Sequence, residues 1–123
     1  MKEKILVIDD DSHIRDMLSE MLQDSGYQVV TAENGYEGIK EYHRDDFQLI
    51  IMDILMPEKE GIETYRELKQ ADSDVKVIAI SGGGQIGAEQ YLRMIRYFGV
   101  QYTFEKPVEK NKLLSTIESI IGQ

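Results

Sequence analysis

Polar residues able to do chemistry end or directly follow four strand-like runs of this 123-residue chain. Asp9 and Asp10 come after the run KILVI, and Asp53 comes directly after LIIM. Ser81 closes VKVIAI, and Lys106 follows VQYTFE. Clustered carboxylates disfavour one another's ionisation, and a hard divalent cation such as Mg²⁺ relieves that repulsion. Because an ammonium and a hydroxyl beside them could contact a phosphoryl group, these residue types indicate Mg²⁺-assisted phosphoryl transfer onto Asp53.

This chemistry requires elements that bring the five side chains together, and the chain alternates strand and helix patterns five times. Strands are expected at Lys4–Asp9, Tyr27–Ala32, Phe47–Asp53, Val75–Ser81 and Val100–Glu105. Helices are expected at Ser12–Ser25, Asn34–Arg44, Gly61–Gln70, Ile86–Phe98 and Val108–Ile121. The alternation predicts an α/β fold of the (βα)5, flavodoxin-like kind: a doubly wound, five-stranded parallel sheet in the order 2-1-3-4-5.

In such a sheet, ligands bind beyond the carboxyl ends of the strands, where the strand order reverses. For this order, that point lies between the first and third strands. The polar residues named above all end or directly follow a predicted strand, so we expect them at one edge of the sheet.

Composition narrows the class of protein. The length suits one domain over residues 1–123, and the absence of cysteine excludes disulfide frameworks and thiolate metal sites. The formal net charge of −9 argues against general nucleic-acid binding, which depends on basic surface. No apolar run approaches the roughly 20 residues that span a bilayer, so we expect no membrane association and a cytoplasmic protein.

The same residues, in this order, resemble the receiver domain of two-component signalling, in its stand-alone form. Each residue is a weak signal by itself. Together they occur in the expected order, each on the expected strand or loop, and the resemblance extends over essentially the whole chain. The matching residues are Asp9-Asp10, Asp53, Met56-Pro57, Gly61, Ser81 and Lys106-Pro107.

The resemblance implies that Asp53 accepts a phosphoryl group from a phosphohistidine on a histidine kinase or a histidine phosphotransfer protein. Ser81 and Lys106 would contact the phosphoryl oxygens, and Ser81 would move toward them as part of a switch. It also implies an Mg²⁺ site formed by Asp10, Asp53 and the backbone carbonyl of Leu55, with Asp9 acting through a water molecule.

Two features depart from the family pattern. The family usually has Tyr or Phe three residues before the lysine, as a switch aromatic, and this chain has Thr103 there with Tyr102 just before it. Either the aromatic step is missing, or Tyr102 or another nearby aromatic replaces it. The segment from Ser81 to Lys106 is also longer than usual and contains Gly82-Gly83-Gly84, which predicts a mobile loop.

The candidate residues also have ordinary structural interpretations. Asp9 and Asp10 could form a solvated acidic turn, Ser81 could cap the following segment, and Lys106 could be a surface lysine. Their occurrence together at strand ends favours a site. Asp11, by contrast, is expected to start the first helix rather than to bind metal.

The Ile86–Phe98 helix carries much apolar surface. It is either a helix with scattered surface apolar residues or a partner-binding face flanked by Arg93 and Arg96, and the resemblance favours the second interpretation. Ile14, in the first helix, is expected at the rim of the site, where a kinase or phosphotransfer domain would dock. The residues that can share one face of the Ile86–Phe98 helix are Ala88, Tyr91, Leu92, Ile95 and Phe98, with Ile86, Met94 and Tyr97 elsewhere.

Two functions of different classes remain open. The first is a phosphoacceptor switch that alters protein–protein affinity or passes its phosphoryl group on. The second is a receiver-like binding module that works without phosphorylation, for which Thr103 is the best support. A flavin or nucleotide binder is disfavoured, because aspartates stand after the first strand where a phosphate-binding glycine loop would be needed.

Overall fold

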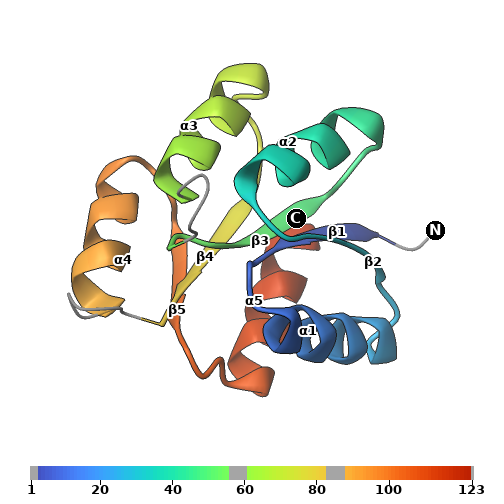
Figure 1. The fold of residues 1–123 in the computed structure, drawn as a ribbon. Coiled ribbons are helices and arrows are strands. Elements are labelled where there is room, and N and C mark those ends of the chain that lie inside the picture. Colours follow the sequence, from blue (N-terminus) through green and yellow to red (C-terminus); the bar gives the residue numbers. More distant parts are fainter. Residues whose placement is uncertain (1–2, 56–60, 83–87, 123) are drawn as a thin grey trace.

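The computed structural model describes residues 3–55, 61–82 and 88–122, in which strands and helices alternate along the chain (Figure 1). The strands are β1 (Lys4–Ile8), β2 (Gln28–Ala32), β3 (Leu49–Asp53), β4 (Val77–Ser81) and β5 (Tyr102–Glu105). The helices are α1 (Ser12–Asp24), α2 (Gly35–Arg44), α3 (Gly61–Ala71), α4 (Ala88–Tyr97) and α5 (Lys110–Ile121).

The strands form one parallel sheet in the order β2-β1-β3-β4-β5, which confirms the predicted topology. The register pairs Ile8 of β1 with Met52 of β3, and Asp53 of β3 with Ile80 of β4. The residues that directly follow β1 and end β3 and β4 therefore meet at one edge of the sheet.

Both faces of the sheet are covered by helices, as Figure 1 shows. Alternate strand residues divide between two cores: Leu6 and Ile8 face α2, α3 and α4, whereas Ile5 and Val7 face α1 and α5. Every residue of β3 and β4 is buried, which explains why these runs are apolar without alternation. Each fully buried Ile or Leu contributes roughly 1.5–3 kcal/mol relative to exposure.

Side-chain caps set the helix starts. The Asp11 side chain accepts a hydrogen bond from His13 N at 2.9 Å, so it caps α1, as predicted. The Asn34 side chain likewise caps α2 by accepting from Glu37 N at 2.9 Å. Helix α5 begins at Lys110 rather than at Val108, because the Glu109 carboxylate accepts from the first free amides of the helix.

Helix α4 ends at Tyr97, one residue before the predicted end at Phe98, and the predicted start at Ile86 lies outside the described residues. Phe98 lies past the helix end, where Gly99 has a φ of +112° that favours glycine. Of the residues predicted to share one face, Leu92 and Ile95 are buried in the core, whereas Phe98 is 39% exposed. None of the described helices is both long and apolar enough to cross a membrane.

Candidate functional site

Asp53 ends the central strand β3 and is only 3% exposed. Its Oδ1 accepts a hydrogen bond from Leu55 N at 3.0 Å, and its Oδ2 accepts one from Lys106 Nζ at 3.1 Å. A buried carboxylate is costly unless it is paired. The Leu55 amide and the Lys106 ammonium therefore offset the buried charge of Asp53 and fix the position of its carboxylate at the sheet edge.

Asp9 follows β1 and is completely buried. Its amide donates to Ala32 O at 3.1 Å, and its Oδ1 accepts from Asp11 N at 2.9 Å. Its Oδ2 forms an ion pair with Lys106 Nζ at 3.1 Å and has no hydrogen-bond partner among the described residues. This oxygen retains capacity for a further cationic contact.

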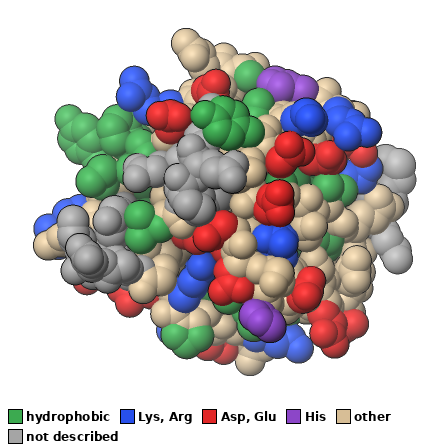
Figure 2. Space-filling model, viewed as in Figure 1, with side chains coloured by type: hydrophobic (Ala, Val, Ile, Leu, Met, Phe, Trp, Pro, Cys, Tyr) green, Lys and Arg blue, Asp and Glu red, His purple; other side chains and the backbone are tan. Residues whose placement is uncertain are grey.

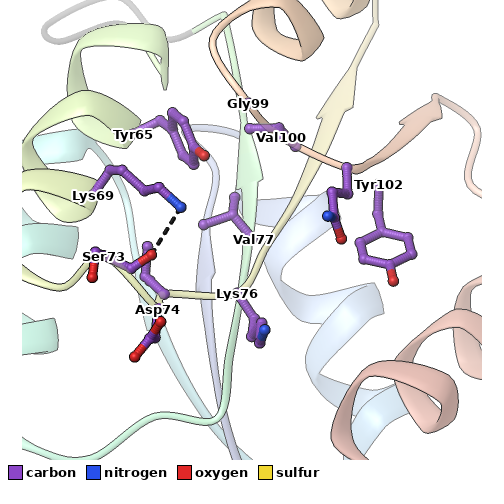
Figure 3. Close-up of a pocket in the computed structure, with 11 residues that line it drawn as sticks. Tyr65, Lys69, Ser73, Asp74, Lys76, Val77, Gly99, Val100 and Tyr102 are labelled. Carbon is purple, nitrogen blue, oxygen red and sulfur yellow. Dashed lines mark hydrogen bonds between the residues drawn. The ribbon is translucent and has the colours of Figure 1, made fainter. Parts of the chain in front are cut away.

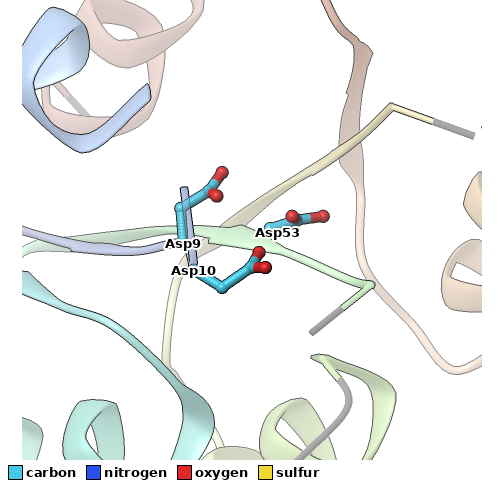
Figure 4. Close-up of side chains that lie close together, drawn as sticks. All are labelled: Asp9, Asp10 and Asp53. Carbon is cyan, nitrogen blue, oxygen red and sulfur yellow. The ribbon is translucent and has the colours of Figure 1, made fainter. Parts of the chain in front are cut away.

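Asp10 is exposed, and it completes the cluster (Figure 4). One carboxylate oxygen from each of Asp9, Asp10 and Asp53 can be chosen so that all three lie within 4.8 Å of one another. The predicted acidic triad is thus brought together from the ends of β1 and β3.

The electrostatics reflect this crowding. Burial raises the pKa of Asp53 to about 6, and the nearby Asp9 carboxylate raises it further. The hydrogen bond from the Leu55 amide and the charge of Lys106 lower this pKa but do not cancel the rise. Burial also raises the pKa of Asp9. Burial alone would lower the pKa of Lys106, but the carboxylates of Asp53 and Asp9 outweigh it and raise that pKa. One ammonium therefore serves two buried carboxylates, and the site retains excess negative charge.

A divalent cation fits this donor set. The three carboxylates supply hard oxygen ligands, and Asp9 Oδ2 is a buried oxygen that is incompletely satisfied. Mg²⁺ commonly binds one or two carboxylates and keeps several waters, which suits a cluster with one exposed member. The chemistry of the site agrees with the Mg²⁺ cofactor predicted from the sequence.

Ser81 and Lys106 lie at the same edge of the sheet and are joined by a main-chain hydrogen bond. Ser81 ends β4 and is completely buried, and its carbonyl accepts a hydrogen bond from Lys106 N at 2.9 Å. Leu55 is half-buried beside Asp53. The predicted loop residues Met56-Pro57 lie outside the described residues, as do Gly83 and Gly84 of the predicted mobile loop.

Gly61 begins α3 directly against the end of β3. Its amide donates to Ile54 O at 3.0 Å, and a Cβ built at Gly61 would lie 2.7 Å from Asp53 O and closer still to Ile54 Cα. No side chain fits this approach, so the glycine predicted as part of the motif sets the spacing between α3 and the aspartate.

Thr103 and Tyr102 face opposite sides of β5. The Thr103 hydroxyl accepts a hydrogen bond from Arg96 Nη1 of α4 at 2.8 Å. Tyr102 packs with the core beneath α1 and α5. Tyr102 therefore does not occupy the environment of the position that holds an aromatic in the family.

The sequence reasoning missed Arg15. Its Nη1 donates to the main-chain oxygen of Asp9 at 2.7 Å, from the second turn of α1. The position is four residues beyond the helix cap Asp11, which is the one sequence signal that could have pointed to it. A charged side chain thus contacts the turn that carries the acidic triad.

A separate cavity of about 260 Å³ lies at the opposite end of the sheet (Figure 3). Its walls include Val77 and Tyr102, the first residues of β4 and β5, whereas the aspartates lie at the carboxyl ends. The Lys69 ammonium beside it donates to Ser73 O at 2.8 Å. This cavity does not belong to the acidic site.

The family model of the response regulator receiver domain matches residues 5–118. The chain belongs to the response regulator receiver family. Chemotaxis protein CheY of Bacillus subtilis is 38% identical over 123 residues, covering 99% of this chain and 100% of that protein. Chemotaxis protein CheY of Halobacterium salinarum is 30% identical over 121 residues, covering 98% of each chain.

Solved receivers share the fold. Response regulator protein TrrA from Thermotoga maritima, solved in complex with Mg(2+)-BeF, has a TM-score of 0.85 and 30% identity, covering 96% of this chain and 98% of that chain. A response regulator receiver domain protein from Clostridium thermocellum has a TM-score of 0.88 and 29% identity, covering 98% and 94% respectively.

Family membership and site geometry together establish the class of function. The protein is a CheY-like receiver whose acidic pocket of Asp9, Asp10 and Asp53 serves Mg²⁺-dependent aspartyl phosphorylation. It is a signalling phosphoacceptor rather than an enzyme in the usual sense, and its partner for phosphorylation is a histidine kinase.

Proposed function

We propose that Asp53 is the phosphoacceptor and that residues 1–123 act as one receiver unit in the cytoplasm. The observation that carries the first assignment is the strand register. Asp53 ends β3 next to β4, which carries Ser81, and lies 3.1 Å from Lys106. Asp9 lies equally close to Lys106, but it follows β1, which pairs with β3 on the side away from β4 and Ser81, so it is poorly placed to receive a phosphoryl group.

In this proposal an oxygen of Asp53 attacks the phosphorus of a phosphohistidine on a kinase or a phosphotransfer protein. The phosphorus–nitrogen bond breaks, and the imidazole leaves with its electron pair and takes up a proton. Asp10, Asp53 and the Leu55 carbonyl would hold Mg²⁺, with Asp9 acting through a water molecule. The ion would offset the negative charge that develops during transfer.

Lys106 and Ser81 complete the response. Lys106 is already within hydrogen-bond distance of Asp53, so a small movement of its side chain would let the ammonium donate to a phosphoryl oxygen. The Ser81 hydroxyl would move to a second phosphoryl oxygen, which shifts the end of β4. Because Thr103 is bonded to α4 in place of a mobile aromatic, the shift would reach α4 through Arg96.

The output is a changed affinity for another protein, or onward transfer of the phosphoryl group. The supporting surface is the predicted Ile86–Phe98 segment. Among its described residues, Met94, Tyr97 and Phe98 are 48%, 87% and 39% exposed, and hydrophobic side chains gather over this end of α4 at the left of Figure 2. Ile14 is half-buried in α1 and would meet the phosphodonor domain at the rim.

The test is incubation with phosphoramidate, a small donor with a phosphorus–nitrogen bond, in the presence of Mg²⁺. Intact-mass spectrometry is expected to show a phosphate-sized gain in the wild type and in the control Asp24→Asn, which removes an exposed acid of α1. Asp53→Asn is expected to show none. A gain that survives Asp53→Asn would contradict the assignment.

The second candidate is a binding module that works without phosphorylation, and the Thr103–Arg96 bond favours it. If this candidate holds, beryllofluoride with Mg²⁺ leaves the NMR spectrum of residues 81–106 unchanged. Large shifts at Ser81, Thr103 and Lys106 would exclude it.

A further inference from the structure

Arg15 reaches back from α1 to the acidic turn. Helical side chains tilt toward the N-terminus of their helix, and the Arg15 guanidinium follows this direction past the helix start. Its Nη1 donates to the main-chain oxygen of Asp9 at 2.7 Å, while its own amide donates to Asp11 O at 3.0 Å inside the helix. The residue thus joins the first turns of α1 to the loop that precedes them.

The contact fixes a peptide plane. The Asp9 oxygen and the Asp10 nitrogen belong to the same planar unit, so a partner that holds this oxygen also sets the direction in which Asp10 leaves the strand. Asp9 itself is held by its amide bond to Ala32 and by the Asp11 amide on its carboxylate. Asp10 is the exposed carboxylate of the triad, and the orientation of its backbone depends on the oxygen that Arg15 holds.

The surroundings of Arg15 favour a fixed, charged side chain. It lines a cavity of about 260 Å³ between α1 and α2, together with Glu33, Glu37 and Glu41. The glutamates line the same cavity as the guanidinium and make its surroundings acidic. Arginine carries a permanent charge and presents several donors in a rigid plane. A lysine would keep the charge but lose the planar fork.

We propose that Arg15 is a positioning residue of the Mg²⁺ site, which holds the Asp9–Asp10 peptide so that the Asp10 carboxylate faces the space between Asp9 and Asp53. This role rests on the proposed phosphoacceptor function. It concerns metal affinity rather than the transfer step. Residues that orient metal ligands from outside typically change metal affinity by about ten- to a hundredfold when they are replaced.

The experiment measures Mg²⁺ binding without a phosphodonor. Isothermal titration calorimetry with MgCl₂ compares the wild type, Arg15→Gln, Arg15→Lys and the control Arg93→Gln, which removes an exposed arginine paired with Glu89. We expect the Mg²⁺ dissociation constant to rise about tenfold in Arg15→Gln and to a lesser degree in Arg15→Lys. Arg93→Gln should match the wild type. Circular dichroism checks that each variant is folded, and Arg15→Lys decides the matter if Arg15→Gln does not fold.

A second reading separates positioning from general damage. In phosphorylation by phosphoramidate, the half-saturating Mg²⁺ concentration should rise by the same factor, while the rate at saturating Mg²⁺ stays within about twofold. Unchanged Mg²⁺ affinity in a folded Arg15 variant, or an equal effect of Arg93→Gln, would overturn the inference. A wild type that binds Mg²⁺ but takes up no phosphoryl group would defeat the proposed function, and the calorimetry would still decide the role of Arg15.

Discussion

Replacing Asp53 with Asn removes a buried negative charge from the end of β3, and we expect the metal-free protein to become more stable. The pKa of Asp53 rises from 3.8 to about 6 on folding, mainly because of burial. The folded state therefore binds this proton more tightly than the unfolded state does. Above the folded pKa the carboxylate must be ionised, and the fold bears the full cost of burying its charge.

The size of the effect follows from the two pKa values. Linkage gives a penalty of about 3 kcal/mol near pH 7.5 and about 1 kcal/mol near pH 4.5, where the folded carboxyl group is already protonated. An asparagine has one acceptor in place of two, so it loses the bond to Leu55 N or to Lys106, at a cost of about 1 kcal/mol. The net gain in the free energy of unfolding is therefore about 2 kcal/mol near pH 7.5 and close to zero near pH 4.5.

Urea unfolding with EDTA present, followed by far-ultraviolet circular dichroism, measures this difference in a chain without tryptophan. The matched control is Asp24→Asn, which removes the same charge at an exposed position and should stay within about 0.5 kcal/mol of the wild type at both pH values. Adding Mg²⁺ should reduce the advantage of Asp53→Asn, because the ion stabilises the wild type by binding its folded state. A gain that does not change with pH, or a less stable Asp53→Asn near pH 7.5, would refute the reasoning.

Three further changes test other parts of the structure by the same unfolding measurement. Gly61→Ala places a methyl group against Ile54 and is expected to cost roughly 1–3 kcal/mol, with weaker Mg²⁺ binding by calorimetry because the end of β3 moves. Asn34→Ala removes the cap of α2 and should cost about 1 kcal/mol, whereas Mg²⁺ affinity stays unchanged. Lys106→Met leaves two buried carboxylates without their cation and should cost roughly 3 kcal/mol near pH 7.5. The loss in Lys106→Met should be smaller near pH 4.5, since protonation of the two carboxyl groups removes the unpaired charge. An equal loss near pH 4.5 and pH 7.5 would contradict this explanation.

The excess negative charge of the site works against the stability of the fold. Asp9 and Asp53 are buried within reach of one lysine, and both pKa values are raised. A protein selected only for stability would not keep this arrangement. The same excess charge favours binding of a divalent cation. Because the cation relieves the repulsion that destabilises the metal-free fold, that relief contributes to the free energy of metal binding.

The sequence predicted the sheet and the acidic edge because both follow from local patterns. Continuous apolar runs identified β3 and β4, which end at Asp53 and Ser81. The strand order then places these two residues side by side at the carboxyl edge of the sheet. The start of α5 differs from the predicted Val108 because the side-chain cap Glu109, and not the apolar pattern, sets it.

Side-chain contacts between neighbouring elements could not be read from the hydrophobic pattern. The bond of Arg96 to Thr103 depends on how α4 packs against β5, and the bond of Arg15 to Asp9 depends on the direction of one side chain. Period-two alternation places Tyr102 and Thr103 on opposite faces of β5, but only the packed structure shows which face meets α4.

The central claim is that Asp53 carries the phosphoryl group, and locating the modification tests it most directly. After phosphorylation by phosphoramidate with Mg²⁺, borohydride reduction converts an acyl phosphate to an alcohol, so a phosphorylated aspartate becomes homoserine. Tandem mass spectrometry of the digested protein should then find homoserine at position 53 only, and only when Mg²⁺ was present. Homoserine at position 9 or 10, or none in a protein that has gained phosphate, would contradict the account.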